Sequence, residues 1–165
     1  MEKVIEDPLF RRVVVSVDPL RGVVGVSAPA LPPATVERLA DHATDPSPVG
    51  TRNGHEVLLT VDGEKGTVTP GTGFAPRRSY RVKAGLAGTS YMLLPLSEHS
   101  SRFERDGAEL GLFRRDQTGQ IEVRWTTRVP PSPREAALGH ALAAAWGIGA
   151  PGTFKSVIGH GGAPL

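Results

Sequence analysis

Five side chains could bind or transform a small molecule. His140 stands in an otherwise apolar segment, and Ser97-Glu98-His99-Ser100-Ser101 places a carboxylate beside an imidazole and hydroxyl groups. A buried imidazole needs a hydrogen-bond partner, and burial can tune it as an acid or a base. The same groups also fit structural roles, with His140 as a hydrogen-bonded core residue and segment 97–101 as a polar turn. If the protein is an enzyme, we expect the reacting groups among His140, Tyr80, Tyr91, Glu98 and His99.

A second set of candidates is cationic. The loop Gly71-Thr72-Gly73-Phe74-Ala75-Pro76-Arg77-Arg78 leads into Arg81 and Lys83. Exposed glycine amides and clustered guanidinium groups can hold a phosphate or a carboxylate. The stretch contains neither a Walker A motif nor a dinucleotide-binding fingerprint. We predict either a long loop whose basic residues face water or an anion-binding site formed by Arg77, Arg78, Arg81 and Lys83.

The composition excludes several other chemistries. Cysteine is absent from the 165 residues, which rules out disulfide bonds, thiolate nucleophiles and cysteine-ligated metal centres. The histidines show no i, i+3 or i, i+4 pairing, and the carboxylates form no Asp-x-Asp loop, so we expect no metal and no cofactor. A formal net charge of +2 is too small to suggest nucleic acid as a partner.

The sequence also lacks the signals of a membrane or secreted protein. No stretch approaches the roughly 20 apolar residues of a spanning helix. Residues 1–10 mix charged and apolar side chains and contain no apolar core of a signal peptide. We therefore expect a cytoplasmic location and no membrane span.

The order of elements predicts a mainly β fold. Short apolar runs bounded by Pro, Gly or Asp-Gly turns are typical of strands. Residues 33–43 differ, because Val36, Leu39, Ala40 and Ala43 have helical spacing, and we predict an outer amphipathic helix there. The strands are expected at 13–17, 23–26, 57–61, 66–69, 80–83 and 91–96.

A two-residue turn at Asp106-Gly107 and a four-residue loop at 116–119 predict a three-stranded meander. In the register that these turns set, one face is apolar, and Glu104 lies opposite Glu109. The pairs predicted on the apolar face are Phe103–Leu110, Leu110–Trp125 and Leu112–Val123.

The last predicted element is a helix that is apolar on all sides. Ser132 is a suitable N-cap, Pro133 fits the first helical position, and Glu135 completes a capping box. Apart from His140, residues 136–146 are apolar at every angle, which is typical of a helix buried all round. We predict an antiparallel barrel or strongly curled sheet that encloses this helix. The domain would span residues 1–148, and residues 149–165 would form a Gly/Pro-rich tail.

The run 102–115, the strand 120–125 and the helix 136–146 resemble the tubby C-terminal-like superfold, which is shared by the tubby, phospholipid-scramblase and LURP-one families. In that superfold an antiparallel barrel encloses a hydrophobic C-terminal helix. The residues before Pro48 and the helix expected at 33–43 do not match it. The resemblance implies binding of phosphoinositides or action at a lipid surface.

Three functions follow from these observations. We predict first a non-catalytic accessory or interaction domain that binds an anionic lipid surface or a protein partner. The alternative is a small enzyme or carrier whose apolar pocket takes a hydrophobic metabolite. A third reading is a subunit that assembles into an oligomer. The position of the last helix distinguishes the interaction domain from the enzyme or carrier, because a helix that fills the barrel is expected to leave no room for a substrate.

Overall fold

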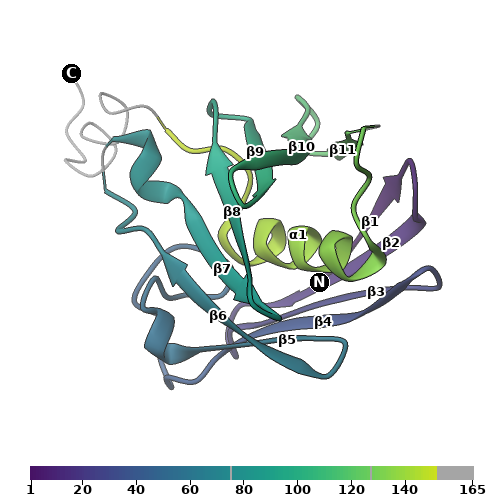
Figure 1. Ribbon diagram of the computed structural model, residues 1–165. Helices are drawn as coiled ribbons and strands as arrows, with labels where there is room; N and C mark the ends of the chain where they lie inside the picture. Colours follow the sequence, from purple (N-terminus) through teal and green to yellow (C-terminus); the bar gives the residue numbers. More distant parts are fainter. Residues whose placement is uncertain (75, 127, 152–165) are drawn as a thin grey trace.

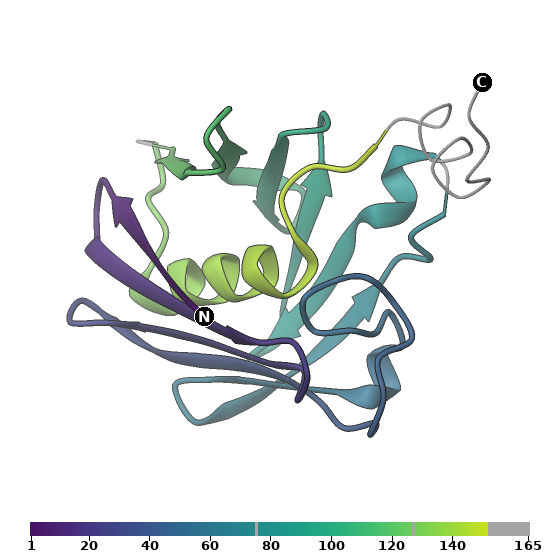
Figure 2. The same ribbon diagram turned by 180° about the vertical axis from the view of Figure 1, so that it is seen from behind.

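A curled antiparallel sheet of eleven strands surrounds one helix in the computed structural model of the chain (Figures 1 and 2). The structure describes residues 1–74, 76–126 and 128–151. Each strand pairs with its neighbours in the sequence, so the sheet is a simple meander from the first strand to the last. The strands are β1 (Glu2–Asp7), β2 (Arg11–Asp18), β3 (Val23–Ala28), β4 (Leu31–Arg38), β5 (Val57–Val61), β6 (Glu64–Pro70), β7 (Val82–Leu86), β8 (Thr89–Pro95), β9 (Ser100–Arg105), β10 (Ala108–Arg115) and β11 (Ile121–Trp125). The helices are α1 (Pro133–Trp146) and two 3-10 turns, η1 (Gly54–Glu56) and η2 (Arg77–Tyr80).

The predicted mainly β fold with an enclosed C-terminal helix is confirmed. Both ribbon views place α1 inside the curl of the sheet, and every residue from Glu135 to Ala143 is buried. The predicted capping box is present, since Ser132 Oγ accepts from the Glu135 amide at 3.2 Å and Glu135 Oε1 accepts from the Ser132 amide at 3.0 Å. The expected strands also form, except that Tyr80 belongs to η2 and β7 begins at Val82.

The outer helix predicted for residues 33–43 is wrong. Residues 31–38 form β4, a strand that pairs with β3 on one side and β5 on the other. Ala34 and Val36 alternate inward with period two, and pairing on both sides overrides the helical spacing. That spacing depended on residues beyond the strand, among them Leu39, which is 59% exposed.

The meander of β9, β10 and β11 is confirmed, including Glu104 opposite Glu109, but its register differs beyond that pair. A bulge between Glu109 and Gly111 inserts one residue. A side chain at Gly111 would place its Cβ 2.5 Å from the Trp125 ring, so glycine makes room for the indole. The observed pairs on this face are Phe103–Gly111, Gly111–Trp125 and Phe113–Val123, in place of Phe103–Leu110, Leu110–Trp125 and Leu112–Val123.

The barrel is nearly closed, with one seam between β1 and β11. In an antiparallel meander of eleven strands the first and the last run in the same direction, and no backbone ladder joins them. Side chains cross the seam instead. Trp125 Nε1 donates to Asp7 Oδ1 at 2.9 Å, and Lys3 Nζ donates to the Gly119 carbonyl at 3.5 Å.

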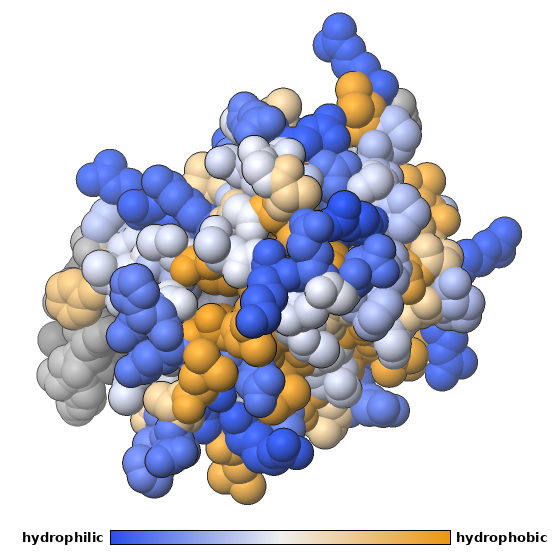
Figure 3. Space-filling view, turned by 60° about the horizontal axis from the view of Figure 1, so that its bottom comes forward, coloured by the Kyte–Doolittle hydropathy of each residue, from blue (hydrophilic) through white to orange (hydrophobic). Residues whose placement is uncertain are grey.

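The outer surface mixes hydrophobic and hydrophilic side chains, as Figure 3 shows for one face. Within the described part of the chain, no helix is both long and apolar enough to cross a membrane. Most of the predicted tail, residues 152–165, lies outside the described residues.

Replacing Gly111 by alanine should lower the free energy of unfolding by about 1–3 kcal/mol, because the added methyl group forces the Trp125 ring out of its place in the core. Urea denaturation measures the change. The control is Glu122→Ala on β11. The Glu122 side chain is 58% exposed, so this substitution should change the free energy of unfolding by no more than about 0.5 kcal/mol. Equal effects of the two substitutions would show that the bulge does not serve to accommodate the indole.

Candidate functional site

A buried carboxylate, Asp7, joins the first strand, the last strand and the helix. Its Oδ2 atom lies 2.8 Å from Nε2 of His140 on α1. Trp125 Nε1 lies 2.9 Å from Oδ1 and 3.0 Å from Oδ2, and the amides of Leu9 and Phe10 donate to Oδ1 at 2.9 Å and 3.1 Å. The side chains of Asp7 and His140 are both fully buried.

These contacts determine the protonation of the pair. Burial raises the pKa of Asp7, but hydrogen bonds from His140, Leu9, Trp125 and Phe10 outweigh burial and hold the pKa below its ordinary value of 3.8. Asp7 is therefore an ionised carboxylate, which only accepts hydrogen bonds. The proton between the two residues must then lie on Nε2 of His140, an assignment that follows from the hydrogen-bond network.

The other ring nitrogen of His140 has no hydrogen-bond partner among the described residues. Nδ1 carries a lone pair when the ring is neutral and a hydrogen when the ring is protonated, so it needs a partner in either state. A buried polar atom left without one costs about 1–3 kcal/mol.

His140 lines a cavity of about 170 Å³, which we call the inner cavity. It lies between α1 and the inner faces of strands on both sides of the seam. The expectation that a filled barrel leaves no room does not hold on this side of α1, where the small residues Ala143, Ala144 and Gly147 line the cavity. The other lining residues are Met1, Lys3, Ile5, Val15, Val17, Pro48, Phe113, Arg115, Ile121 and Ile148.

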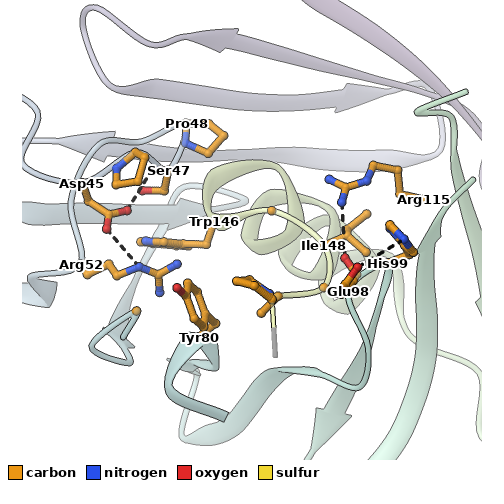
Figure 4. A pocket seen from close by; sticks show the side chains of 16 residues that line it. Asp45, Ser47, Pro48, Arg52, Tyr80, Glu98, His99, Arg115, Trp146 and Ile148 are labelled. Atoms are coloured by element: carbon orange, nitrogen blue, oxygen red, sulfur yellow. Dashed lines mark hydrogen bonds and ion pairs between the residues drawn. The ribbon is translucent and has the colours of Figure 1, made fainter. Parts of the chain in front are cut away.

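A second hollow of about 480 Å³, the outer cleft, opens where α1 ends (Figure 4). On one side, Arg52 Nε lies 3.3 Å from Asp45 Oδ1, and Arg52 Cζ lies 4.9 Å from the centre of the Tyr80 ring. On the other side, His99 Nε2 lies 3.9 Å from Glu98 Oε2. Figure 4 shows the two polar groups on either side of the helix end.

The inner cavity and the outer cleft adjoin, because both are lined by Pro48, Arg115, Gly147 and Ile148. Charged side chains of both signs line the cleft. The cavity is mostly apolar, and His140 is one of its lining residues. Together they provide an entrance with charged groups beside an apolar interior, an arrangement typical of small-molecule sites.

Tyr91 lies at the opposite end of α1. Its hydroxyl donates to Glu135 Oε2 at 2.9 Å, and Arg105 Nη1 donates to the same carboxylate at 2.9 Å and 3.0 Å. Burial and the bond to Glu135 raise the pKa of Tyr91 to about 12. Burial raises the pKa of Glu135, but bonds from Ser132, Arg105 and Tyr91 lower it below its ordinary value. Tyr91 therefore keeps its proton and holds the start of the helix.

The structure thus divides the five residues predicted for catalysis among three places. Tyr80, Glu98 and His99 line the outer cleft, His140 lines the inner cavity, and Tyr91 is bound to Glu135. Sequence reasoning missed Asp7 and Arg115. Asp7 stands beside Glu6 in a mixed charged and apolar segment, which gives no sign of its burial, and its partners lie 118 and 133 positions away.

The predicted anion site draws on residues around η2 and β7. Arg77 Nε donates to the Ala150 carbonyl at 3.0 Å, and Arg81 Nη1 donates to the Arg78 carbonyl at 3.0 Å. Lys83 is exposed on β7. Anion binding by Arg77, Arg78, Arg81 and Lys83 stays a prediction.

Comparisons of the chain with protein-family models, curated proteins and solved structures found no match. The resemblance to the tubby-like superfold therefore stays a prediction. The functional argument depends on the geometry of the site.

Replacing Asp7 by asparagine should lower the free energy of unfolding by about 1–3 kcal/mol at neutral pH, because an amide accepts at only one atom and turns its NH₂ group toward a donor. Since the pKa of Asp7 is lowered on folding, its contribution is complete well above the ordinary value of 3.8 and is lost as the pH falls below 3.8 and through the lowered pKa of the folded state. The loss of stability on acidification should thus be smaller in Asp7→Asn than in the wild type.

Urea denaturation between about pH 6 and about pH 3 measures this difference. Asp18→Asn serves as the control, since the Asp18 carboxylate accepts from the Arg21 amide in an exposed turn at 3.2 Å. An acid dependence in Asp7→Asn as steep as that of the wild type would contradict the proposed role of the carboxylate.

Proposed function

We propose that the protein binds a compact apolar molecule in the inner cavity, and that a polar group of this ligand bonds to Nδ1 of His140. The observation that carries the proposal is that His140, whose Nδ1 has no hydrogen-bond partner among the described residues, is one of the residues that line an apolar cavity. Asp7 fixes the orientation of the ring through Nε2, so Nδ1 is held in place before any ligand arrives.

The volume of the cavity sets the size of the ligand. An engineered apolar cavity of about 150 Å³ in another protein holds benzene. The inner cavity of about 170 Å³ therefore suits one six-membered ring with a small substituent, or an aliphatic group of similar size. Apolar contacts with Phe113, Ile121 and the alanines of α1 would supply most of the affinity.

The polar group that fits best is a hydroxyl. A hydroxyl both donates and accepts, so it satisfies Nδ1 whether the imidazole is neutral or protonated. A carbonyl can only accept and suits the protonated ring alone.

The geometry supports binding more strongly than catalysis. An imidazole that acts as a general base needs a second reacting group within hydrogen-bond reach. Among the described candidates, Tyr80, Glu98 and His99 line the outer cleft, and Tyr91 is engaged by Glu135. The proposal thus combines the non-catalytic role predicted from the sequence with the apolar pocket of the alternative. An anionic lipid surface or a protein partner has no comparable support among the described residues.

Phenol and benzene are the probes that test this proposal. Phenol should shift the methyl resonances of Ala143 and Ala144 and the imidazole ¹⁵N resonance of His140, because its ring fills the cavity and its hydroxyl meets Nδ1. Benzene should shift the same methyl groups and leave the imidazole signal nearly unchanged. Titrations followed by NMR on isotope-labelled protein give both results.

Ala143→Leu and Ala144→Leu fill the cavity and should abolish binding of both probes, whereas Ala108→Leu, at an exposed position of β10, should not. Two filling variants are used because Ala143 is more deeply buried than Ala144, and its replacement could disturb folding. Phenol shifts that survive in a folded filling variant, or that are absent in the wild type, would refute the proposal.

A further inference from the structure

We infer that the ligand of the inner cavity is a hydroxylated monocarboxylate, with its hydroxyl at His140 and its carboxylate at Arg115 and Lys3. This inference rests on the proposed function and adds the charge and the orientation of the ligand. It follows from the charged groups at the rim of the cavity and from their position on the inner face of the barrel.

Two cationic side chains, Lys3 and Arg115, and no carboxylate side chain line the inner cavity, and the ammonium group of Met1, which also lines it, donates to the Val17 carbonyl at 3.1 Å. Lys3 lies on the inner face of β1 together with Ile5 and Asp7, because alternate residues of a strand share a face. Arg115 follows Phe113 on the inner face of β10 in the same way. Both side chains are exposed near the ends of their strands, with Lys3 Nζ 3.5 Å from the Gly119 carbonyl, and they form a positive rim beside an apolar interior.

The negative charges nearby are engaged elsewhere. Asp7 accepts a hydrogen bond from Nε2 of His140, so its carboxylate lies against that nitrogen and not against Nδ1. Asp45 lines only the outer cleft and pairs with Arg52, and the Glu98 carboxylate lies 3.9 Å from His99. The rim of the cavity therefore has an excess of positive charge, whereas the outer cleft pairs charges within itself.

Arg115 has donors available for a ligand. Its Nη2 atom donates to the Glu98 carbonyl at 3.4 Å, a long contact with a neutral acceptor. A guanidinium group carries five N–H donors and pairs with a carboxylate through two of them. Since Arg115 lines both the cavity and the cleft, a carboxylate placed there remains partly in water and loses little of its hydration.

Three probes that share one ring separate these contributions. p-Cresol carries only the hydroxyl, phenylacetate carries only the carboxylate, and 4-hydroxyphenylacetate carries both. We expect 4-hydroxyphenylacetate to bind about three- to tenfold more tightly than p-cresol, the gain expected of a partly exposed charge pair. The advantage should shrink between about 50 mM and about 500 mM salt, because ions screen the pair.

Arg115→Gln should remove most of that advantage and leave the affinity for p-cresol unchanged. Arg114→Gln is the matched control, because Arg114 is the neighbouring residue, is 59% exposed and does not line the inner cavity. Lys3→Gln should reduce the advantage to a smaller extent, since an ammonium group lacks the paired donors of a guanidinium.

The outcomes separate the two proposals. If p-cresol binds in the cavity but the carboxylate adds no affinity, or adds the same affinity in Arg115→Gln, the inference on charge is wrong and the proposed function stands. If 4-hydroxyphenylacetate shifts only residues of the outer cleft, such as His99, the inference is likewise wrong. If neither p-cresol nor phenol binds in the cavity, both proposals fail.

Discussion

Asp7 accepts hydrogen bonds from an indole on β11, an imidazole on α1 and two amides of the turn after β1. A buried charge is tolerated only when its hydrogen bonds are satisfied. The loss of any one of these donors therefore destabilises the carboxylate to which the other donors are bonded. Closure of the barrel, the position of the helix and the orientation of His140 are therefore coupled through one side chain. The inner cavity depends on the same coupling, because Asp7 orients the ring of His140, one of the residues that line the cavity.

Much of the architecture could be predicted because its signals are local. Ser132, Pro133 and Glu135 define the start of α1, and the all-round apolar pattern that follows predicts its burial. Asp106-Gly107 fixes a turn in the same local way. Two predictions were wrong, and at both places tertiary packing determines the local structure. At 33–43 pairing on both sides of β4 prevailed over helical spacing, and at Gly111 the size of the distant Trp125 ring imposed a bulge that no turn rule contains.

The site was less predictable, since its parts are distant in the sequence. His140 stood out because it is the one titratable side chain in residues 136–146, and it is buried and belongs to the lining of a cavity. The adjacent pair Glu98 and His99 reaches the outer cleft together with Tyr80, a convergence that spacing along the chain did not indicate. Asp7 and Arg115 were missed because they look like ordinary polar residues at the ends of strands. Only the curl of the sheet brings Asp7 against His140 and places Arg115 in the lining of the inner cavity.

The odd number of strands has a consequence for how molecules reach the interior. Ten antiparallel ladders hold the wall together, and the eleventh junction, between β1 and β11, consists of side-chain contacts. The inner cavity lies beneath that junction, bounded by Lys3 and Ile5 on one side and Ile121 on the other. Opening the wall along this line breaks no backbone ladder. Beside the entrance at the outer cleft, this junction is therefore the part of the wall whose opening is opposed by side-chain contacts alone.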